Sequence, residues 1–461
     1  MIEIITIISV IILFYFALLW SGYLILLLST MITVVDKFKA IAMNRVIKAL
    51  NDNPLLPITV IIPAYNESKR IINTINALLT ADYKNVHFII VNDGSKDDTL
   101  ALLIKTYDLV RVIDSFKITI KTGKVMDYYQ SNRISNFIVV DKEHSPFENS
   151  AADCVNAGLN ICRTPLFVTI DADTMLEKEA LTHILYTYLI TPHCVAVGGS
   201  IYVPQVTRTK TKHHFSKNIP KNLVLGIQVC EYLRSFLYGR EGFNFLGGAL
   251  CHPGAFTLFE KKAVMDVGGY DAANFSYDAE IIMKLHDNMR KNKFPYTVAY
   301  APGAMAWSEE PHTLMGLWAQ RARWQRGLLR GLGKHWHMLF NPQFGITGLL
   351  GFPYYVLFEV CGPVVEAISY IMLVLVFLFL PLPLSMLLWL LLLAWSYMLM
   401  LTIACIILSI LTYNQYYSLL DIIHILGLSM IDMVFYRQWR AFCALFSSIH
   451  YFINRLRGKP E

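Results

Sequence analysis

The stretch Leu166-Phe-Val-Thr-Ile-Asp-Ala-Asp-Thr174 decides the fold class of this chain. Its first five residues are apolar or β-branched and follow Pro165, which predicts a buried strand that ends at Asp171 and Asp173. Open α/β sheets bind ligands at the carboxyl ends of their strands. Two carboxylates this close repel each other unless a cation lies between them, and their oxygens suit Mg²⁺ or Mn²⁺ bridging a diphosphate. The alternative is an acidic turn that caps a helix over 176–187, and the stretch alone leaves both open.

Apolar strands alternate with helical stretches between Pro57 and about residue 290, which predicts an α/β domain. The polar, irregular segment 117–147, around the apolar run 137–140, is interpreted as an insertion. The pattern predicts strands at 58–62, 86–91, 110–113, 166–170 and 195–203, an extended segment at 256–259, and helices at 69–79, 97–106, 147–160, 223–238 and 277–290.

The N-terminal region predicts a transmembrane helix. Residues 4–35 contain no charge, and this run is longer than the ~20 residues that a helix needs to cross the hydrocarbon core. It lacks the basic start, the shorter apolar run and the small-residue cleavage site of a secretory signal, so we expect the helix to be retained. Positive charges that follow the run place the next domain in the cytoplasm and the N-terminus outside. They are Lys37, Lys39, Arg45 and Lys48.

The last third of the chain is again apolar. Residues 362–380 are a spanning candidate interrupted only by Glu366, the segment 381–383 is a natural turn, and 384–410 is a second span without charges. Glu366 reads as interfacial, although an acid within a membrane segment is by default a functional candidate. Two shorter stretches, 422–435 and 441–453, either cross the bilayer as a hairpin or lie along its surface, because Asp432, Arg437 and Arg440 interrupt them. Both options return the basic tail to the cytoplasm.

Composition narrows the functional classes. The net charge of +6 is small and scattered, and the basic loop 208–221 reads as a solvated loop rather than a binding surface for phosphate or lipid headgroups. The eight cysteines form no Cys-x-x-Cys pair, which fits a reduced cytosolic compartment. A Rossmann dehydrogenase needs Gly-x-Gly-x-x-Gly after its first strand and a phosphate-loop enzyme needs Gly-Lys-Ser/Thr. Pro63-Ala-Tyr-Asn-Glu67 offers neither, so metal and carboxylate would have to hold a diphosphate.

Six sequence blocks occur in a characteristic order over about residues 55–345. In these blocks the chain resembles the family 2 glycosyltransferases with a GT-A fold. It resembles in particular the membrane-embedded processive branch, which includes cellulose, hyaluronan and poly-N-acetylglucosamine synthases. Each block alone is weak, but six in order beside membrane segments are specific. The blocks are Val60-Ile-Ile-Pro-Ala-Tyr-Asn-Glu67, Val91-Asn-Asp-Gly-Ser95, Asp153 with Asn156-Ala-Gly158, Asp171-Ala-Asp173, Tyr277-Asp-Ala-Glu280 and Gln320-Arg-Ala-Arg-Trp324.

The resemblance implies a role for each matched residue. Asp278 would be the general base and Asp173 would ligate Mg²⁺ or Mn²⁺ on the diphosphate. Trp324 would form a stacking floor for the acceptor sugar, with Gln320 and Arg323 on phosphate or sugar hydroxyls. The nucleoside of a UDP-sugar would be held by the loop Ala64 to Glu67, including Tyr65, and by Asp93, Asp153 and Asp171.

Other interpretations of these residues stay open. Asp278 could cap the helix that begins beside it, and Trp324 could anchor a helix at the membrane interface. Glu280 is either a second acid or a solvated helix residue, and His252 is expected to be packed rather than catalytic.

Two departures from the family pattern bear on activity. Ser276-Tyr277-Asp278 has a phenol where a carboxylate commonly precedes the base, and Ala151 stands where many members carry a lysine. These changes could alter donor choice, slow turnover or mark a protein that binds without catalysing.

The sequence therefore predicts an α/β GT-A domain with a Rossmann-like mixed sheet between N- and C-terminal transmembrane helices. The expected divisions are a transmembrane helix over 1–36, a cytoplasmic catalytic domain over 37–306, interfacial helices over 307–361 with aromatic and arginine residues at helical spacing, and a transmembrane channel region over 362–461.

The expected activity is inverting elongation of a β-linked polysaccharide from a UDP-sugar, coupled to export through a bacterial inner membrane. The partners would be the donor, a glycan or lipid acceptor, the bilayer and an accessory membrane subunit, without nucleic acid. The alternatives are single-sugar transfer to a lipid or short glycan, and a non-catalytic sugar-nucleotide-binding subunit.

Overall fold

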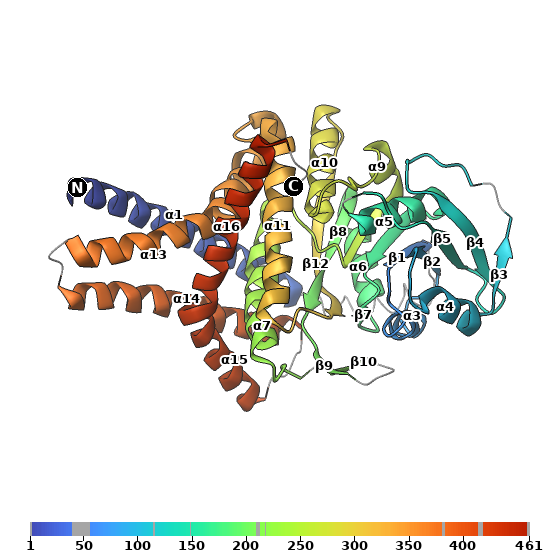
Figure 1. Cartoon of the computed structure of the whole chain (residues 1–461), viewed down its shortest axis with the longest axis horizontal. Coiled ribbons are helices and arrows are strands. Elements are labelled where there is room, and N and C mark those ends of the chain that lie inside the picture. The colour runs from blue at the N-terminus through green and yellow to red at the C-terminus, as the bar shows by residue number, and fades with distance from the viewer. Residues whose placement is uncertain are drawn as a thin grey trace.

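An α/β domain and a bundle of long apolar helices form the two ends of the molecule (Figure 1). The computed structural model describes residues 2–38, 56–113, 116–147, 149–208, 213–216, 218–379, 383–413 and 418–458. Helices α7 (Leu223–Arg234), α11 (Leu314–Lys334) and α16 (Arg437–Leu456) lie between the two ends.

A ten-stranded mixed sheet in the order β3-β4-β5-β2-β1-β6-β11-β8-β12-β7 forms the centre of the α/β domain. Strands β5, β2, β1 and β6 run parallel, and β11 pairs with β6 and β8 in the antiparallel sense. The strands are β1 (Ile58–Ala64), β2 (Val86–Asp93), β3 (Leu109–Val112), β4 (Val125–Ser131), β5 (Phe137–Lys142), β6 (Leu166–Ile170), β7 (Thr174–Leu176), β8 (Cys194–Tyr202), β11 (Phe256–Glu260) and β12 (Thr297–Ser308). A separate hairpin consists of β9 (Gln205–Arg208) and β10 (His213–Ser216).

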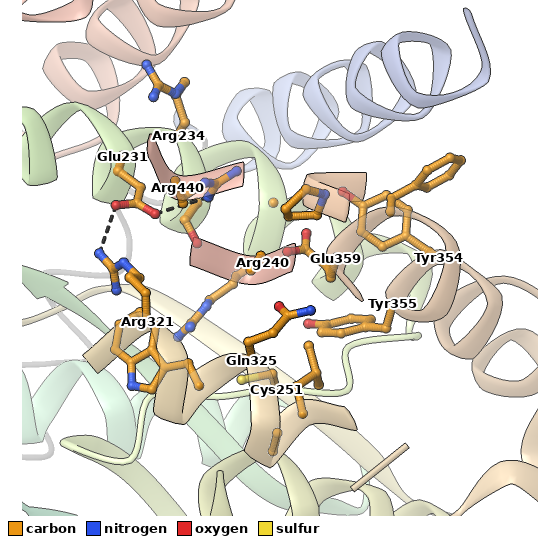
Figure 2. Close-up of a pocket in the computed structure, with 18 of the residues that line it drawn as sticks. Glu231, Arg234, Arg240, Cys251, Arg321, Gln325, Tyr354, Tyr355, Glu359 and Arg440 are labelled. Carbon is orange, nitrogen blue, oxygen red and sulfur yellow. Dashed lines mark hydrogen bonds and ion pairs between the residues drawn. The ribbon is translucent and has the colours of Figure 1, made fainter. Parts of the chain in front are cut away.

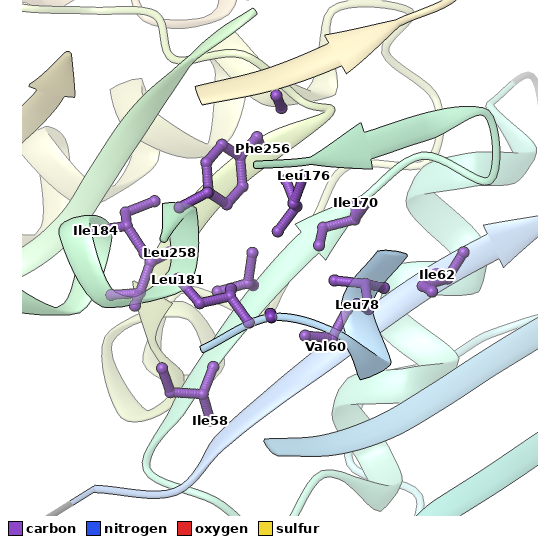
Figure 3. Close-up of a cluster of buried hydrophobic side chains, with 14 of the residues drawn as sticks. Ile58, Val60, Ile62, Leu78, Ile170, Leu176, Leu181, Ile184, Phe256 and Leu258 are labelled. Carbon is purple, nitrogen blue, oxygen red and sulfur yellow. The ribbon is translucent and has the colours of Figure 1, made fainter. Parts of the chain in front are cut away.

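Alternation along β1 builds two cores, one on each face of the sheet. Ile58, Val60 and Ile62 belong to the cluster in Figure 3, whereas Ile61 belongs to the cluster on the other face. Both faces of the central strands are buried, as expected for parallel strands covered by helices. The first cluster is covered by α3 (Ile71–Leu79), α4 (Thr99–Tyr107) and α6 (Ala180–Ile190), and the second by α5 (Ser150–Ile161), α9 (Lys261–Asp266) and α10 (Tyr277–Lys291).

Four helical segments are long and apolar enough to cross a membrane: Ile2–Thr33, Thr347–Phe379, Leu384–Ile410 and Leu419–Leu456. With four such segments, the chain is an integral membrane protein. The elements involved are α1 (Ile2–Phe38), η5 (Thr347–Gly351), α12 (Phe352–Tyr354), η6 (Tyr355–Val360), α13 (Cys361–Phe379), α14 (Leu384–Tyr413), α15 (Leu419–Ile431), η7 (Asp432–Tyr436) and α16. The two short stretches near the C-terminus thus belong to one helical run rather than to two separate segments.

Buried ion pairs connect the α/β domain to this bundle. Glu231 of α7 accepts hydrogen bonds from Arg321 of α11 at 2.8 Å and from Arg440 of α16 at 3.1 Å. Arg234 pairs with Asp432 within the same region. Each side chain is largely buried, so losing one partner would leave an uncompensated charge. Four short helical elements complete the described chain: η2 (Ser235–Arg240), α8 (Glu241–Leu246), η3 (Trp336–Met338) and η4 (Pro342–Phe344).

The structure corrects several expected elements. Segment 117–147 is not an insertion, because it supplies β4 and β5, and β5 pairs directly with β2. The helix expected over 176–187 begins at Ala180, after β7 has paired with β12. Trp307 belongs to β12, and α11 begins only at Leu314. Parts of other expectations lie outside the described residues, namely Lys39, Arg45, Lys48, residues 209–212 and 217 of the basic loop, the turn residues 381–382, and Lys459.

Candidate functional site

The Asp171-Ala-Asp173 turn follows β6 and lies at the floor of a cavity of about 770 Å³. Two hydrogen bonds fix the turn: Thr74 of α3 donates to the Ala172 carbonyl at 2.7 Å, and the Thr174 amide donates to the Asp171 carbonyl at 3.0 Å. Both carboxylates line the cavity. The turn is therefore a rigid platform for two anionic groups at a strand end.

The electrostatics of this pair fit a divalent cation. Burial raises the pKa of Asp171 to about 7, with further contributions from the charges of Asp278, Glu310 and Glu67. Burial and the neighbouring Asp171 charge raise the pKa of Asp173 well above its usual value. Burial and mutual repulsion make it unfavourable for these two carboxylates to be charged without a cation beside them. Carboxylate oxygens are the ligands that Mg²⁺ and Mn²⁺ prefer.

Asp278 faces the same cavity from the first turn of α10. Its Oδ2 accepts a hydrogen bond from the Gly254 amide at 3.2 Å, and its Oδ1 accepts one from the Ala279 amide at 3.0 Å. Burial raises the pKa of this carboxyl, and the positive charge of Arg240 opposes the shift. The N-cap residue of α10 is Ser276, which makes no side-chain cap bond, whereas Asp278 both accepts a hydrogen bond from a first-turn amide and lines the cavity.

Helix α11 brings Gln320, Arg323 and Trp324 to the opposite wall of the cavity. Gln320 donates to Glu310 at 2.8 Å. Burial and the adjacent Arg326 lower the pKa of Arg323, which makes no ion pair among the described residues. Trp324 is 43% exposed. The wall therefore presents an arginine with no ion-pair partner among the described residues, and a partly exposed indole that packs against the Arg321 guanidinium, 4.1 Å from the ring centre.

Asp93 and Asp153 come together on a buried lysine instead of lining the cavity. Lys142 Nζ contacts an Asp93 oxygen and lies 3.0 Å from Asp153 Oδ2. The Gly123 amide also donates to Asp153 at 3.1 Å. Lys142 and Asp153 are fully buried and Asp93 is 1% exposed. This cluster holds three elements together and keeps one net negative charge beneath the surface.

The loop Ala64 to Glu67 is joined to the loop after β2. Asn66, in the left-handed region at φ 58°, accepts a hydrogen bond from the Lys96 amide at 2.8 Å, and its own amide donates to Ser95 at 3.0 Å. Glu67 pairs with Arg70 at 3.0 Å, Ala64 is buried, and the Tyr65 ring is 36% exposed. Tyr65 is the only aromatic residue of this loop, and its ring stacks on the His144 imidazole with the ring centres 4.4 Å apart.

Glu280 is not part of the cavity. Its carboxylate is fully buried among basic side chains, with Lys334 at 2.8 Å and Lys284 at 3.6 Å. Burial raises its pKa, but the hydrogen bond to His335 and the charges of the two lysines outweigh burial and lower it. Glu280 therefore stabilises the packing of α10 on α11 and is removed from the site.

The two departures from the family pattern both fall at the cavity, where Ala151 and Tyr277 are part of the lining. Burial raises the pKa of the Tyr277 phenol well above its usual value, so the group stays neutral. Among the described residues no lysine lines the cavity, and its arginines are Arg70, Arg240 and Arg323. Because Arg70 is engaged by Glu67 and Glu309, Arg323 and Arg240 are the two cations left to take the place of the missing lysine.

A second cavity of about 330 Å³ extends from the site into the helix bundle (Figure 2). Asp278 and Trp324 line both cavities. The second one is bounded by α1, η6, α14, η7 and α16 and combines aromatic with charged groups, among them Tyr354, Tyr355, Phe358, Glu359 and Arg440. The two cavities therefore share part of their lining, and the second one is lined by aromatic and charged groups among the apolar helices.

Arg240 and Lys142 were missed by sequence reasoning. Arg240 of η2 lines both cavities, and its Nη1 is buried without a hydrogen-bond partner among the described residues. Its guanidinium lies 4.2 Å from the centre of the Phe236 ring. Neither residue belongs to a recognisable sequence pattern, because each meets its partners across a long sequence separation.

Other polar groups have structural explanations. His252 is buried, and burial lowers its pKa to about 3, so it is a neutral packed residue as expected. Glu366 is buried and pairs with Arg437. Asp287, His335 and His337 have ligand-capable atoms within 4.8 Å of one another, but Asp287 is already paired with His337 and Lys291, at 2.8 Å each.

The mixed sheet and the acidic turn at its centre define a GT-A-like glycosyltransferase fold. The sequence profile described as "Glycosyltransferase like family 2" matches residues 54–327, and the chain belongs to this family. A mannosyltransferase of Pyrobaculum calidifontis, solved with GDP-Man and Mn²⁺, superposes with a TM-score of 0.50 over 85% of this chain and 100% of that one, at 16% identity.

The chain is also similar to two bacterial synthases. The poly-beta-1,6-N-acetyl-D-glucosamine synthase of Staphylococcus aureus strain COL is 28% identical over 309 residues, which are 67% of this chain and 61% of the relative. The protein of the same name from Staphylococcus epidermidis is 27% identical over 271 residues, 59% of this chain and 54% of the relative. The match thus spans about three fifths of the length of these curated relatives.

Proposed function

We propose that this protein is a metal-dependent inverting glycosyltransferase that extends a β-linked polysaccharide from a cytosolic UDP-sugar and passes the product into the membrane. The observation that carries the proposal is that Asp278 and Trp324 line both the cavity at the acidic turn and the cavity among the apolar helices. A soluble transferase needs no polar path among apolar helices, whereas an enzyme that exports its product does.

Donor binding is assigned to the acidic turn and α11. Asp173 would ligate the divalent cation, with Asp171 beside it and toward the nucleoside. When bound, this cation neutralises the charge that builds on the leaving diphosphate. Arg323 faces the same cavity without an anionic partner, so it is placed to bind a phosphate oxygen. The uracil base of the donor would bind at Tyr65 and Asp93.

Acceptor activation is assigned to Asp278. A sugar hydroxyl that attacks the anomeric carbon must lose its proton, and a carboxylate within hydrogen-bond reach can accept it. Amide donors from Gly254 and Ala279 fix the orientation of this carboxylate. Attack from the face opposite the diphosphate inverts the anomeric configuration. The exposed indole of Trp324 offers the flat apolar surface that a pyranose ring needs beneath it.

The sugar is assigned through the relatives. Both carry the name poly-beta-1,6-N-acetyl-D-glucosamine synthase, so UDP-N-acetylglucosamine is the first donor to test. We place the chain in the bacterial inner (cytoplasmic) membrane with the α/β domain in the cytoplasm, and the basic residues after the first span support this orientation. An accessory membrane subunit would pack against the bundle.

A donor panel tests the proposal. Purified protein with Mg²⁺ or Mn²⁺ should release UDP from at least one UDP-sugar, and product length on a gel separates polymerisation from single transfer. In inverted vesicles, polymer protected from an added glycosidase indicates export. Failure of a folded preparation to release UDP from any donor would refute the proposed function.

A further inference from the structure

His144 packs against the residues assigned to the base of the donor. Its imidazole stacks on the Tyr65 ring with the ring centres 4.4 Å apart and the planes 27° from parallel. Its Nδ1 lies 2.7 Å from Asp93 Oδ2 and 3.2 Å from the Asp93 carbonyl oxygen. The imidazole therefore contacts an aromatic face and a carboxylate at the same time.

The Asp93 carboxylate is asymmetric. Lys142 and the Ser145 amide, the latter at 3.1 Å, both contact Oδ1. Oδ2 is buried and accepts no well-aligned hydrogen bond among the described residues, His144 Nδ1 lies 2.7 Å from it, and the Cys154 thiol also lies beside the carboxylate. With Lys142 shared between Asp93 and Asp153, the cluster keeps one net negative charge. Oδ2 can therefore accept a hydrogen bond from an N–H group on the side where His144 lies.

The backbone of His144 is fixed while its side chain is open. Lys142 Nζ binds the Glu143 carbonyl at 3.0 Å on one side, and the Ser145 amide binds Asp93 on the other. A Cβ at Gly94 would lie 2.7 Å from the His144 nitrogen, so the two backbones are in close contact. The His144 side chain is nevertheless 50% exposed, so rotation about its own bonds can carry the ring into solvent.

An imidazole in this position imitates a pyrimidine base. Both are flat rings that stack on a phenol, and both can direct a ring N–H at a carboxylate. A third ring cannot enter between Tyr65 and His144, because a sandwiched base needs about 7 Å between the outer rings, twice the ~3.5 Å contact of carbon atoms. A base that stacks on this face of Tyr65 and the imidazole therefore exclude each other.

We propose that His144 occupies the nucleobase subsite of this protein and is displaced when a uridine nucleotide binds, so that it lowers the affinity for the donor. The inference rests on the proposed function, which places the base at Tyr65 and Asp93. His144 then acts as an internal competitor of the base. A ligand displaces it well only if its ring can both stack on Tyr65 and donate an N–H to Asp93.

The test is binding of uridine monophosphate to the full-length protein in detergent, measured by isothermal titration calorimetry. His144→Ala should bind about threefold to tenfold more tightly than the wild type, which is what loss of one competing aromatic pair is worth. Binding of Mn²⁺-pyrophosphate, which has no base, should not change. His450→Ala, an exposed histidine on α16, is the matched control and should bind both ligands like the wild type.

The remaining outcomes overturn the inference in distinguishable ways. Equal affinity of wild type and His144→Ala for uridine monophosphate would show that the imidazole does not compete. Weaker binding by the variant would make His144 a direct contact of the base. If neither protein binds uridine monophosphate or UDP while both bind Mn²⁺-pyrophosphate, the proposed uridine donor fails, and the inference fails with it.

Discussion

Replacement of Lys142 by Met should destabilise the α/β domain strongly. The side chain is fully buried and is the cation shared by Asp93 and Asp153. Breaking a buried pair by removing one partner costs about 3–5 kcal/mol, because a charge remains buried without compensation. A domain of this size loses about 2–4 °C of melting temperature per kcal/mol, so we expect a decrease of about 10 °C.

Thermal unfolding followed by tryptophan fluorescence in detergent measures this change. Lys124→Met is the matched control, since its pair with Glu143 is 68% and 56% exposed and contributes at most about 1 kcal/mol. A melting temperature equal to that of Lys124→Met would refute the reasoning.

Four further predictions concern the cavity. Asp173→Asn should weaken Mn²⁺ binding at least about tenfold by calorimetry, since a ligating oxygen is lost, and unchanged affinity would remove Asp173 from the metal site. Arg240→Met should move the acid limb of the kcat/KM profile to higher pH, because the arginine charge holds down the pKa of Asp278; an unmoved limb would contradict that role. Trp324→Ala should shorten the product or raise the KM for a soluble acceptor more than it lowers kcat, and Trp324→Phe should restore part of the loss. Glu280→Gln should lower the melting temperature while kcat stays within about threefold of the wild type, since a buried ion pair is lost outside the cavity; a collapse of kcat with an unchanged melting temperature would return Glu280 to the site.

The strands and the acidic turn were accessible from sequence because their signals are local. Apolar runs such as 58–62 and 166–170 end in polar turns, and the structure places β1 and β6 at those positions. Strand β4 was missed because it lies near the sheet edge, mostly half-exposed, with Asp127 among its residues. Its partner β5 has a clear apolar run, but a polar neighbourhood made the whole segment read as an insertion.

Side-chain partners across long separations could not be predicted. Lys142, Arg240 and His144 belong to no periodic pattern, and their roles depend on contacts with elements distant in sequence. The case of Glu280 is different. Residues two apart on a helix point to nearly opposite sides, so Asp278 and Glu280 could not both face one cavity once α10 was assigned. Helix geometry would have excluded it without coordinates.

Release of UDP by purified wild-type protein and by Asp278→Asn tests the central claim most directly. With UDP-N-acetylglucosamine and Mn²⁺, we expect turnover by the wild type and a decrease of about 10²–10⁴-fold in the variant, the usual worth of a positioned general base. Glu280→Gln, two residues away and outside the cavity, should retain activity. Equal UDP release by wild type and Asp278→Asn would contradict the account.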